Sequence, residues 1–328
     1  MVKILTRIML RRSIITVFIL FFMLSTTVSK CEEKQLILGG QYIKLLNLKE
    51  DKKRNDTEQY KNQERFFRPS KAPILNNKID EIFYNMYGTD TSKIKIPNKF
   101  LKNPEDTIIN YFSVLREAAN PVEGSETGCG SLGDTRAPYP IAYKFLSDSY
   151  KNKVSYENYL KSFENTLHIN LIKLNKVGSD KENPDIIKYF VEIETIEGTN
   201  ESKGVFAYYF GYIYLQKQGE VYKIVNMNFT PENYLCAPYH GWSYDAKSFV
   251  EIEYGNWCSL IDNKVYVKEN GYEKKVYFKD KNMNEYYVLF YQLTNGVDIK
   301  IADYKKNKDG KWDQIYIDPT KCLEKNNK

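Results

Sequence analysis

Between residues 167 and 229 the sequence contains four successive runs in which apolar and polar residues alternate, and no other feature constrains the fold as strongly. A period of two places successive side chains on opposite faces of a β-strand. The runs predict strands over Leu167–Val177, Ile186–Ile196, Gly204–Lys217 and Glu220–Phe229. Gly198 with Asn200 marks one turn, and Gln218-Gly219-Glu220 marks a tight hairpin. We therefore expect an antiparallel sheet in the middle of the chain.

The third run is unusually rich in aromatic residues. Alternation places five of them on one strand face, namely Phe206, Tyr208, Phe210, Tyr212 and Tyr214. Packing of this face against helices is the simplest interpretation. Because buried tyrosine hydroxyls need hydrogen-bond partners, a pocket or interface that uses Tyr208, Tyr212 and Tyr214 is the alternative.

Helical spacing of apolar residues precedes the strands. It predicts helices over Ile74–Tyr87, Pro104–Ala119, Ile141–Tyr150 and Ser155–Thr166. Asn103 is a suitable cap for the second of these, because a proline and two acidic residues follow it. Helices followed by an antiparallel sheet are typical of an α+β fold in which the helices pack on one sheet face.

This order of elements resembles the NTF2-like cone fold, which ketosteroid isomerase and polyketide cyclases also use. The resemblance rests on the helix Pro104–Ala119, on Ala142-Tyr143-Lys144-Phe145-Leu146-Ser147, and on the long last strands that end at Val225-Asn226-Met227-Asn228-Phe229. It covers about residues 100–232. It implies a curved antiparallel sheet that wraps around the helices and encloses an apolar pocket, in some members with an acid/base residue.

The segment after Pro231 departs from a minimal domain of this kind. A helical stretch from Tyr244 to Trp257 follows it, and we expect this insertion to cover a sheet edge or the mouth of the cone. Five further strand-like runs come next, over Val265–Lys268, Lys274–Lys279, Glu285–Leu293, Val297–Tyr304 and Lys311–Ile317. Asn-Gly or Asp-Gly pairs at residues 270, 295 and 309 mark hairpin corners. We expect a small antiparallel meander that packs on the preceding domain, because alone it would be marginally stable.

The N-terminus has the pattern of an export signal. Basic residues precede the apolar run Ile14–Leu24, and small or polar residues follow it, with a cleavage position before Lys30. The apolar run is about half of the ~20 residues that a spanning helix needs, so we favour a cleaved signal over an uncleaved anchor. Export through a twin-arginine route at Arg11-Arg12, and lipidation of Cys31, are alternatives.

These features divide the chain into a signal peptide (1–29), a charged linker (30–71), an NTF2-like α+β domain (72–262) and a C-terminal β unit (263–328). The formal charge of +6 includes four cations of the first 12 residues, so the exported chain would carry about +2. That balance gives no reason to expect a nucleic-acid partner, which would require a strongly basic patch. We expect contact with a membrane only through an uncleaved N-terminal segment.

Export also changes the interpretation of the cysteines, because disulfides form in oxidising compartments. Four cysteines lie in the region expected to fold: Cys129, Cys236, Cys258 and Cys322. Cys236 and Cys258 flank the predicted helix and are the favoured pair, and Cys129 with Cys236 is the alternative. The spacing of Cys236 and His240 is not that of a zinc site, so we expect no metal and no cofactor. A catalytic Cys236–His240 pair would need a free thiol, which export disfavours.

Candidate acid/base residues are few. Glu192 and Glu194 share one face of the second strand, and a solvated face is the simplest interpretation. If that face instead lined the cone, burial would raise a carboxyl pKa and make Glu192 a candidate base. His168 has the same two interpretations, a surface or capping residue or an acid/base.

The function that we favour is that of an exported, non-catalytic binding protein, secreted or associated with the cell envelope. Its partner would be another protein, a cell-wall component or a small apolar ligand. The alternative is an isomerase, dehydratase or cyclase with its site inside the cone, although no acid/base set of those enzymes matches this chain residue by residue. The candidate ligand-binding residues are Tyr208, Tyr212, Tyr214, His168, Glu192, His240 and Trp242.

Overall fold

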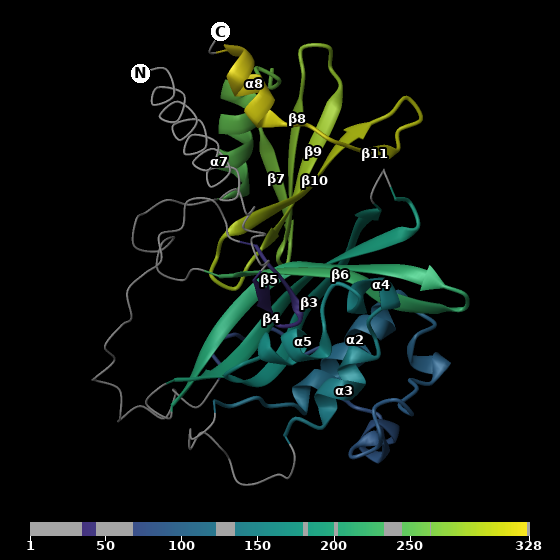
Figure 1. Ribbon diagram of the computed structural model, residues 1–328. Helices are drawn as coiled ribbons and strands as arrows, with labels where there is room; N and C mark the ends of the chain where they lie inside the picture. Colours follow the sequence, from purple (N-terminus) through teal and green to yellow (C-terminus); the bar gives the residue numbers. More distant parts are fainter. Residues whose placement is uncertain are drawn as a thin grey trace, which may run out of the picture. The chain divides into compact units, whose positions relative to one another are not determined.

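The computed structural model describes residues 35–43, 68–122, 135–179, 183–199, 203–232, 245–262 and 264–326. Within these ranges the fold is α+β, with a six-stranded sheet (sheet A), a separate five-stranded antiparallel sheet (sheet B) and short helices (Figure 1). None of the helices in these ranges is long and apolar enough to cross a membrane.

The strands of sheet A lie in the order β1-β2-β6-β5-β4-β3, and β3 to β6 are the four predicted central strands. Its strands are β1 (Leu36–Ile37), β2 (Gly40–Tyr42), β3 (Thr166–Ser179), β4 (Ile186–Gly198), β5 (Gly204–Gln218) and β6 (Val221–Pro231). The strands β3 to β6 form antiparallel pairs, which confirms the pattern of alternation. The N-terminal strand β2 adds a parallel neighbour to β6, which the sequence did not lead us to expect.

Glycine is required at one point inside this sheet. A Cβ atom on Gly211 of β5 would lie 1.9 Å from the backbone oxygen of Asn228 on β6. Any larger residue at this position would therefore force the two strands apart.

Helices cover one face of sheet A (Figure 1). They are η2 (Glu81–Met86), η3 (Asn98–Phe100), α2 (Pro104–Arg116), α3 (Pro138–Tyr143), α4 (Asp148–Lys151) and α5 (Tyr156–Lys161). The helix α2 begins as predicted, with the Asn103 side chain accepting a hydrogen bond from the backbone N–H of Glu105 at 2.9 Å. Only the 3₁₀ helix η2 forms within the helix predicted over residues 74–87.

The single helix predicted over Ile141–Tyr150 is wrong, because α3 and α4 are separated there. The backbone N–H of Ser147 donates to the carbonyl of Ile224 at 2.8 Å, and the N–H of Ile224 donates to the carbonyl of Phe145 at 3.1 Å. These residues therefore extend along β6 instead of continuing the helix. Tertiary hydrogen bonding overrides the local helical pattern at this point.

Large aromatic side chains fill the space between the helices and sheet A. Completely or almost completely buried examples are Tyr111, Phe112, Tyr139, Phe145, Tyr159 and Phe163. They share one apolar cluster with Tyr209, Ile213 and Leu215 of β5. The face of β5 that meets the helices is therefore the one opposite to Phe206–Tyr214. The expectation that the aromatic face packs against the helices is wrong, because it points away from them.

Sheet B follows in the order β11-β10-β9-β8-β7. Its strands are β7 (Tyr266–Asn270), β8 (Glu273–Lys279), β9 (Glu285–Gln292), β10 (Asp298–Lys306) and β11 (Trp312–Ile315). The predicted corner residues Gly271, Gly296 and Gly310 all have positive φ angles, which glycine adopts without steric cost. The predicted antiparallel meander is confirmed.

The helical stretch after residue 244 packs on one face of sheet B and not on an edge of sheet A. It consists of α7 (Ala246–Val250) and the π-helical turn η4 (Glu251–Trp257). Val250 and Tyr254 are buried against Val276, Val288 and Phe290 of sheet B. The expectation that this stretch covers the cone is therefore wrong. A short C-terminal helix, α8 (Pro319–Asn326), was not predicted.

The other face of sheet B meets the face of sheet A that carries the aromatic residues of β5. Phe190 and Phe210 of sheet A share a buried cluster with Leu289 and Tyr291 of sheet B. The rings of Phe190 and Tyr291 lie 5.1 Å apart in an edge-to-face arrangement, which is favourable for aromatic pairs. We call this contact the seam.

One disulfide is present among the described residues, and it joins Cys258 at the end of η4 to Cys322 in α8. The favoured pairing of Cys236 with Cys258 is therefore wrong. That pair is suggested by the predicted helix that the two cysteines flank, whereas the partner of Cys258 lies in α8, which the sequence pattern does not predict. Cys129 and Cys236 lie outside the described residues.

We expect removal of this disulfide to destabilise the protein. The bond closes a loop with a sequence separation of 64 residues. The chain-entropy model assigns up to about 4 kcal/mol to a loop of this size. Urea unfolding of the Cys258→Ser/Cys322→Ser double variant, compared with the wild type, measures the difference. Peptide mapping that recovers Cys258 linked to Cys236 would contradict the assignment.

Candidate functional site

Two glutamates of β4 are the most heavily buried acidic residues of sheet A. Glu192 and Glu194 lie on the face that points away from the helices, and each has an exposed fraction of 0%. The interpretation that Glu192 and Glu194 lie on a solvated face is therefore wrong. The alternative that they line the inside of the cone is also wrong, because the helices cover the opposite face of the sheet. Because buried carboxylates are stable only when they are paired and hydrogen-bonded, their partners define the candidate site.

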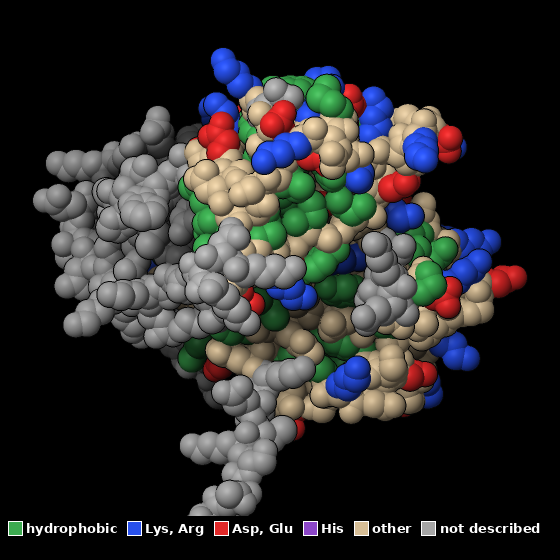
Figure 2. Space-filling model, turned by 90° about the horizontal axis from the view of Figure 1, so that it is seen from above, with side chains coloured by type: hydrophobic (Ala, Val, Ile, Leu, Met, Phe, Trp, Pro, Cys, Tyr) green, Lys and Arg blue, Asp and Glu red, His purple; other side chains and the backbone are tan. Residues whose placement is uncertain are grey.

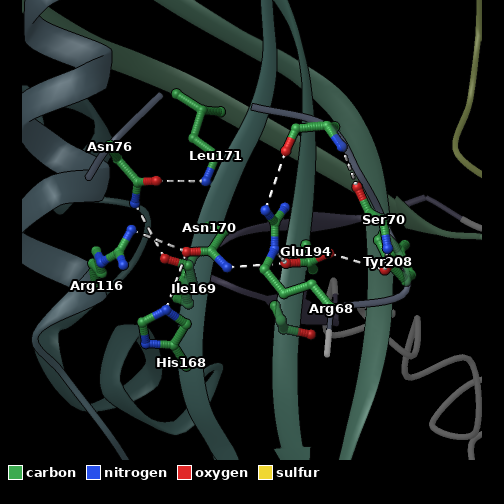
Figure 3. A network of polar contacts seen from close by, with 12 residues as sticks. Arg68, Ser70, Asn76, Arg116, His168, Ile169, Asn170, Leu171, Glu194 and Tyr208 are labelled. Atoms are coloured by element: carbon green, nitrogen blue, oxygen red, sulfur yellow. Dashed lines mark hydrogen bonds and ion pairs between the residues drawn. The ribbon is translucent and has the colours of Figure 1, made fainter. Parts of the chain in front are cut away.

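Glu194 receives three donors from three different parts of the chain (Figure 3). Arg68 donates from Nε to Oε1 at 2.6 Å, and Asn170 donates from Nδ2 to the same oxygen at 2.9 Å. The hydroxyl of Tyr208 donates to Oε2 at 2.9 Å. The guanidinium supplies the compensating charge, so this carboxylate is fully satisfied in the interior.

The same contacts fix residues 68–72 on the outer face of sheet A. The backbone N–H of Ser70 donates to the Tyr208 hydroxyl at 3.1 Å, and Arg68 Nη1 donates to the carbonyl of Ala72 at 3.1 Å. Burial, followed by the neighbouring Glu194, raises the pKa of Tyr208. Its hydroxyl is therefore a neutral link between the strand and this segment.

The chain then crosses the outer edge of β3. The N–H of Leu75 donates to the carbonyl of Leu171, and the N–H of Leu171 donates to Asn76 Oδ1 at 2.8 Å. Asn76 Nδ2 also donates to the carbonyls of Phe112 and Ile169, at 2.9 and 3.1 Å. Residues 68–76, which we call the strap, thus satisfy backbone groups that an edge strand would otherwise expose.

His168 belongs to the margin of this network. Its Nε2 lies 3.0 Å from Asn170 Oδ1, which also accepts from Arg116 Nη1 at 3.2 Å. Burial, followed by the positive charge of Arg116, lowers the pKa of His168. We therefore assign a neutral ring that donates from Nε2.

Glu192 is held by a second set of partners that includes sheet B. Lys173 Nζ lies 2.5 Å from Oε2, and the backbone N–H of Thr294 donates to Oε1 at 2.8 Å together with the Thr294 hydroxyl. Lys173 also donates to the carbonyl of Gln292 at 2.6 Å. The turn between β9 and β10 therefore binds both members of an ion pair that sheet A supplies.

Glu232 is a third ionisable residue beside this pair. Both of its carboxylate oxygens are shielded from solvent. Burial raises its pKa well above the usual value, the neighbouring Glu192 raises it further, and Lys173 opposes the shift. One lysine thus faces two carboxyl groups, and the raised pKa of Glu232 favours its protonated form.

Sequence analysis missed Glu232, although strand register could have indicated it. Glu192 pairs with Phe210, and Phe210 pairs with Thr230. Glu232 lies two residues after Thr230 and so belongs to the same face. To place Glu232 beside Glu192, one must know which residues of β4, β5 and β6 are cross-strand partners. The alternation of apolar and polar residues does not give this information.

The other predicted residues do not join these networks as described. Lys188 Nζ lies 3.8 Å from the ring centroid of Tyr212 and 5.7 Å from that of Tyr214. His240 and Trp242 lie outside the described residues. The structure therefore brings His168 and Tyr208 together around Glu194, and it places Glu192 in a separate cluster at the seam.

The partners of these carboxylates are groups that the chain itself supplies. Every carboxylate in these networks is buried, and cations or hydrogen-bond donors of the chain itself surround Glu192 and Glu194. In the ranges that the structure describes, no group of three or more His, Cys, Asp or Glu side chains could hold a metal ion. Lys173 is the cation that pairs with Glu192, and its charge opposes the rise in the pKa of Glu232.

We expect the Lys173–Glu192 pair to be essential for the seam. Lys173→Met should destabilise the protein by about 3–5 kcal/mol, because it leaves a buried carboxylate without its cation. Adding Glu192→Gln should recover part of the loss. Chemical unfolding measures both effects. The exposed pair Lys247–Glu251 is the control, where Lys247→Met should cost less than about 1 kcal/mol. Equal effects at the two sites would contradict the role of burial.

The raised pKa of Glu232 predicts a pH-dependent stability. Because the folded protein retains a proton that the unfolded chain loses near pH 4.3, this contribution is complete below about that pH. It decreases as the pH rises toward the folded-state pKa. Glu232→Gln should remove this component and flatten the profile of unfolding free energy above about pH 4.3. An unchanged slope in the variant would contradict the assignment.

Known proteins supply no further guide to this site. Comparisons with protein-family models, with curated proteins and with solved structures found no match. The NTF2-like resemblance therefore stays a prediction. What can be said of function follows from the residues themselves.

Proposed function

We propose that this chain is an exported, non-catalytic binding protein of the cell envelope or extracellular space, built on an NTF2-like domain. The observation that carries the proposal is that Glu192 and Glu194 are both buried and paired. Both carboxylates have an exposed fraction of 0% and are bonded to groups of the chain itself. A general acid or base must come within hydrogen-bond distance of its substrate. A carboxylate that is buried and already bonded to the chain itself does not meet this requirement.

The isomerase, dehydratase or cyclase alternative receives less support. It requires an acid/base residue on the helix-facing side of sheet A, but Glu192 and Glu194 lie on the other side. Several tyrosine hydroxyls on the helix-facing side are bonded to protein groups, with Tyr111 and Tyr159 3.1 Å apart and Tyr150 donating to the carbonyl of Gly39 at 2.7 Å. Glu197 on this side accepts from the Tyr209 hydroxyl at 2.6 Å, and the buried Tyr139 hydroxyl has no hydrogen-bond partner among the described residues.

Two features support the finer parts of the proposal. Helices on one face of four long antiparallel strands agree with an NTF2-like domain, whereas β2, sheet B and the strap are additions to it. The Cys258–Cys322 disulfide agrees with an oxidising compartment, as the export signal implies.

The test is binding to the envelope of the producing cells. The chain from Lys30 onward, with its disulfide intact, is labelled and titrated against isolated cell walls, membranes and medium proteins of that organism. We expect saturable binding to one fraction, because folded binding surfaces are limited in number. Heat-unfolded protein serves as the control. Absence of saturable binding to all three fractions would contradict the proposal, as would turnover that Glu192→Gln abolishes without loss of stability.

A further inference from the structure

Four tyrosines form a continuous row across sheet B, which we call the tyrosine row. Each is the direct cross-strand partner of the next, from β7 to β10: Tyr266, Tyr277, Tyr287 and Tyr304. They lie on the face of sheet B that also carries Leu289 and Tyr291, the residues of the seam. Neither the ion pairs nor the seam uses Tyr266.

The rings of the row form two stacked pairs, and between these pairs the rings of Tyr277 and Tyr287 lie 5.3 Å apart with planes inclined by 45°. The ring centroids of Tyr266 and Tyr277 are 4.9 Å apart with planes inclined by 6°, and those of Tyr287 and Tyr304 are 4.5 Å apart with planes inclined by 15°. Trp312 packs edge-on against Tyr277 and Tyr287 at 5.9 and 4.7 Å. The inner rings are therefore fixed by their neighbours.

The row is open at one end. Tyr266 belongs to β7, the outermost strand of sheet B, so one of its ring faces has Tyr277 beside it and the other has no neighbouring strand in the part of the chain that the structure describes. Its exposed fraction is 52%, the largest in the row. This rigid ring has an apolar face available to a ligand, and its orientation is already set by the stack.

Two lysines lie opposite each other next to this open end. Lys268 of β7 and Lys275 of β8 are direct cross-strand partners, and like charges in this position destabilise a sheet. Glu273 neutralises Lys275 at 2.7 Å, whereas Lys268 is exposed and its Nζ lies 5.4 Å from the Tyr277 ring centroid. Positive charge therefore remains at this corner.

This excess of charge is local. On the molecular face in Figure 2, Lys and Arg side chains are interspersed with Asp and Glu side chains around a central group of hydrophobic ones. A ligand that recognised only general basic character would find little preference on such a surface. The corner at Tyr266 offers a combination of one apolar ring face and adjacent cations.

We propose that the corner of sheet B formed by Tyr266, Lys268 and Lys275 binds a polysaccharide that carries carboxylate groups. This inference rests on the proposed binding function and specifies its ligand. The C–H face of a sugar ring packs on the open face of Tyr266, and a carboxylate pairs with the Lys268 ammonium group. Glu273 already compensates Lys275, so Lys268 is the cation that the ligand anion meets.

Two other polyanions fit less well. Single-stranded nucleic acid needs several free ring faces for successive bases, whereas neighbouring rings already contact the inner rings of the row. The acidic side chains of a peptide would use the lysine charge, but they have no ring of C–H groups to pack on the open face of Tyr266. A carboxylated sugar uses both features at once.

The experiment is calorimetric titration of the chain from Lys30 onward with oligogalacturonate and with its methyl ester. The two probes have the same sugar rings and differ in charge. We expect binding of the acid form that weakens with salt, and much weaker binding of the ester. Tyr266→Ala should weaken binding by at least about tenfold, and Lys268→Gln should weaken it and reduce its salt dependence.

Tyr316→Ala is the matched control, because Tyr316 is 76% exposed and lies outside the row. It should bind as the wild type does, and the unfolding free energies of all variants should be compared first. Equal affinity for acid and ester, no binding of oligogalacturonate, unchanged binding by Tyr266→Ala, or a preference for polyglutamate or single-stranded DNA would each overturn the proposal. Envelope binding that survives in Tyr266→Ala would overturn only this inference, whereas its absence in the wild type would overturn the proposed function.

Discussion

Compensation of buried charge is the constraint on which the rest of this structure depends. Sheet A places the side chains of two glutamates completely out of contact with water, and an unpaired buried charge would cost far more than the few kcal/mol that stabilise a domain. Each carboxylate therefore needs a cation at a defined position. Arg68 supplies one from the strap, and Lys173 supplies the other from β3.

These two cations explain why distant parts of the chain have fixed positions. Through Arg68, the segment before the first helix is held on the outer face of the sheet and then crosses its edge. Through Lys173 and Thr294, a turn of sheet B is held against β3 and β4. Apolar contacts such as that of Phe190 with Tyr291 supply area to the seam, and the Lys173–Glu192 pair adds polar contacts to Gln292 and Thr294 across it.

Much of the fold could be predicted from the sequence, because alternation and turn residues are local signals. The strands β3 to β6, the meander of sheet B and the cap at Asn103 all follow from short stretches of sequence. The side of β5 that faces the helices could not be predicted in this way, because two apolar faces compete and only tertiary packing decides between them. The aromatic face was assigned to the wrong layer for this reason.

Only part of the candidate site could be predicted from the sequence. Glu192, His168 and Tyr208 were recognised as residues of interest, but the partners that determine their roles come from elsewhere in the chain. Arg68 lies in a stretch whose composition is that of a linker, and Glu232 follows a strand end without any local pattern. Long-range register, which one sequence does not reveal, was the missing information.

The parallel pairing of β2 with β6 has a consequence for how the chain matures. Residues 40–42 emerge early from a ribosome or a translocation pore, whereas their partners at residues 228–229 emerge much later. The early hairpin must therefore remain without its neighbour while most of the chain is still being delivered, and such distant pairings are slow to form. Proteases and chaperones have their best opportunity to act on this protein during that interval.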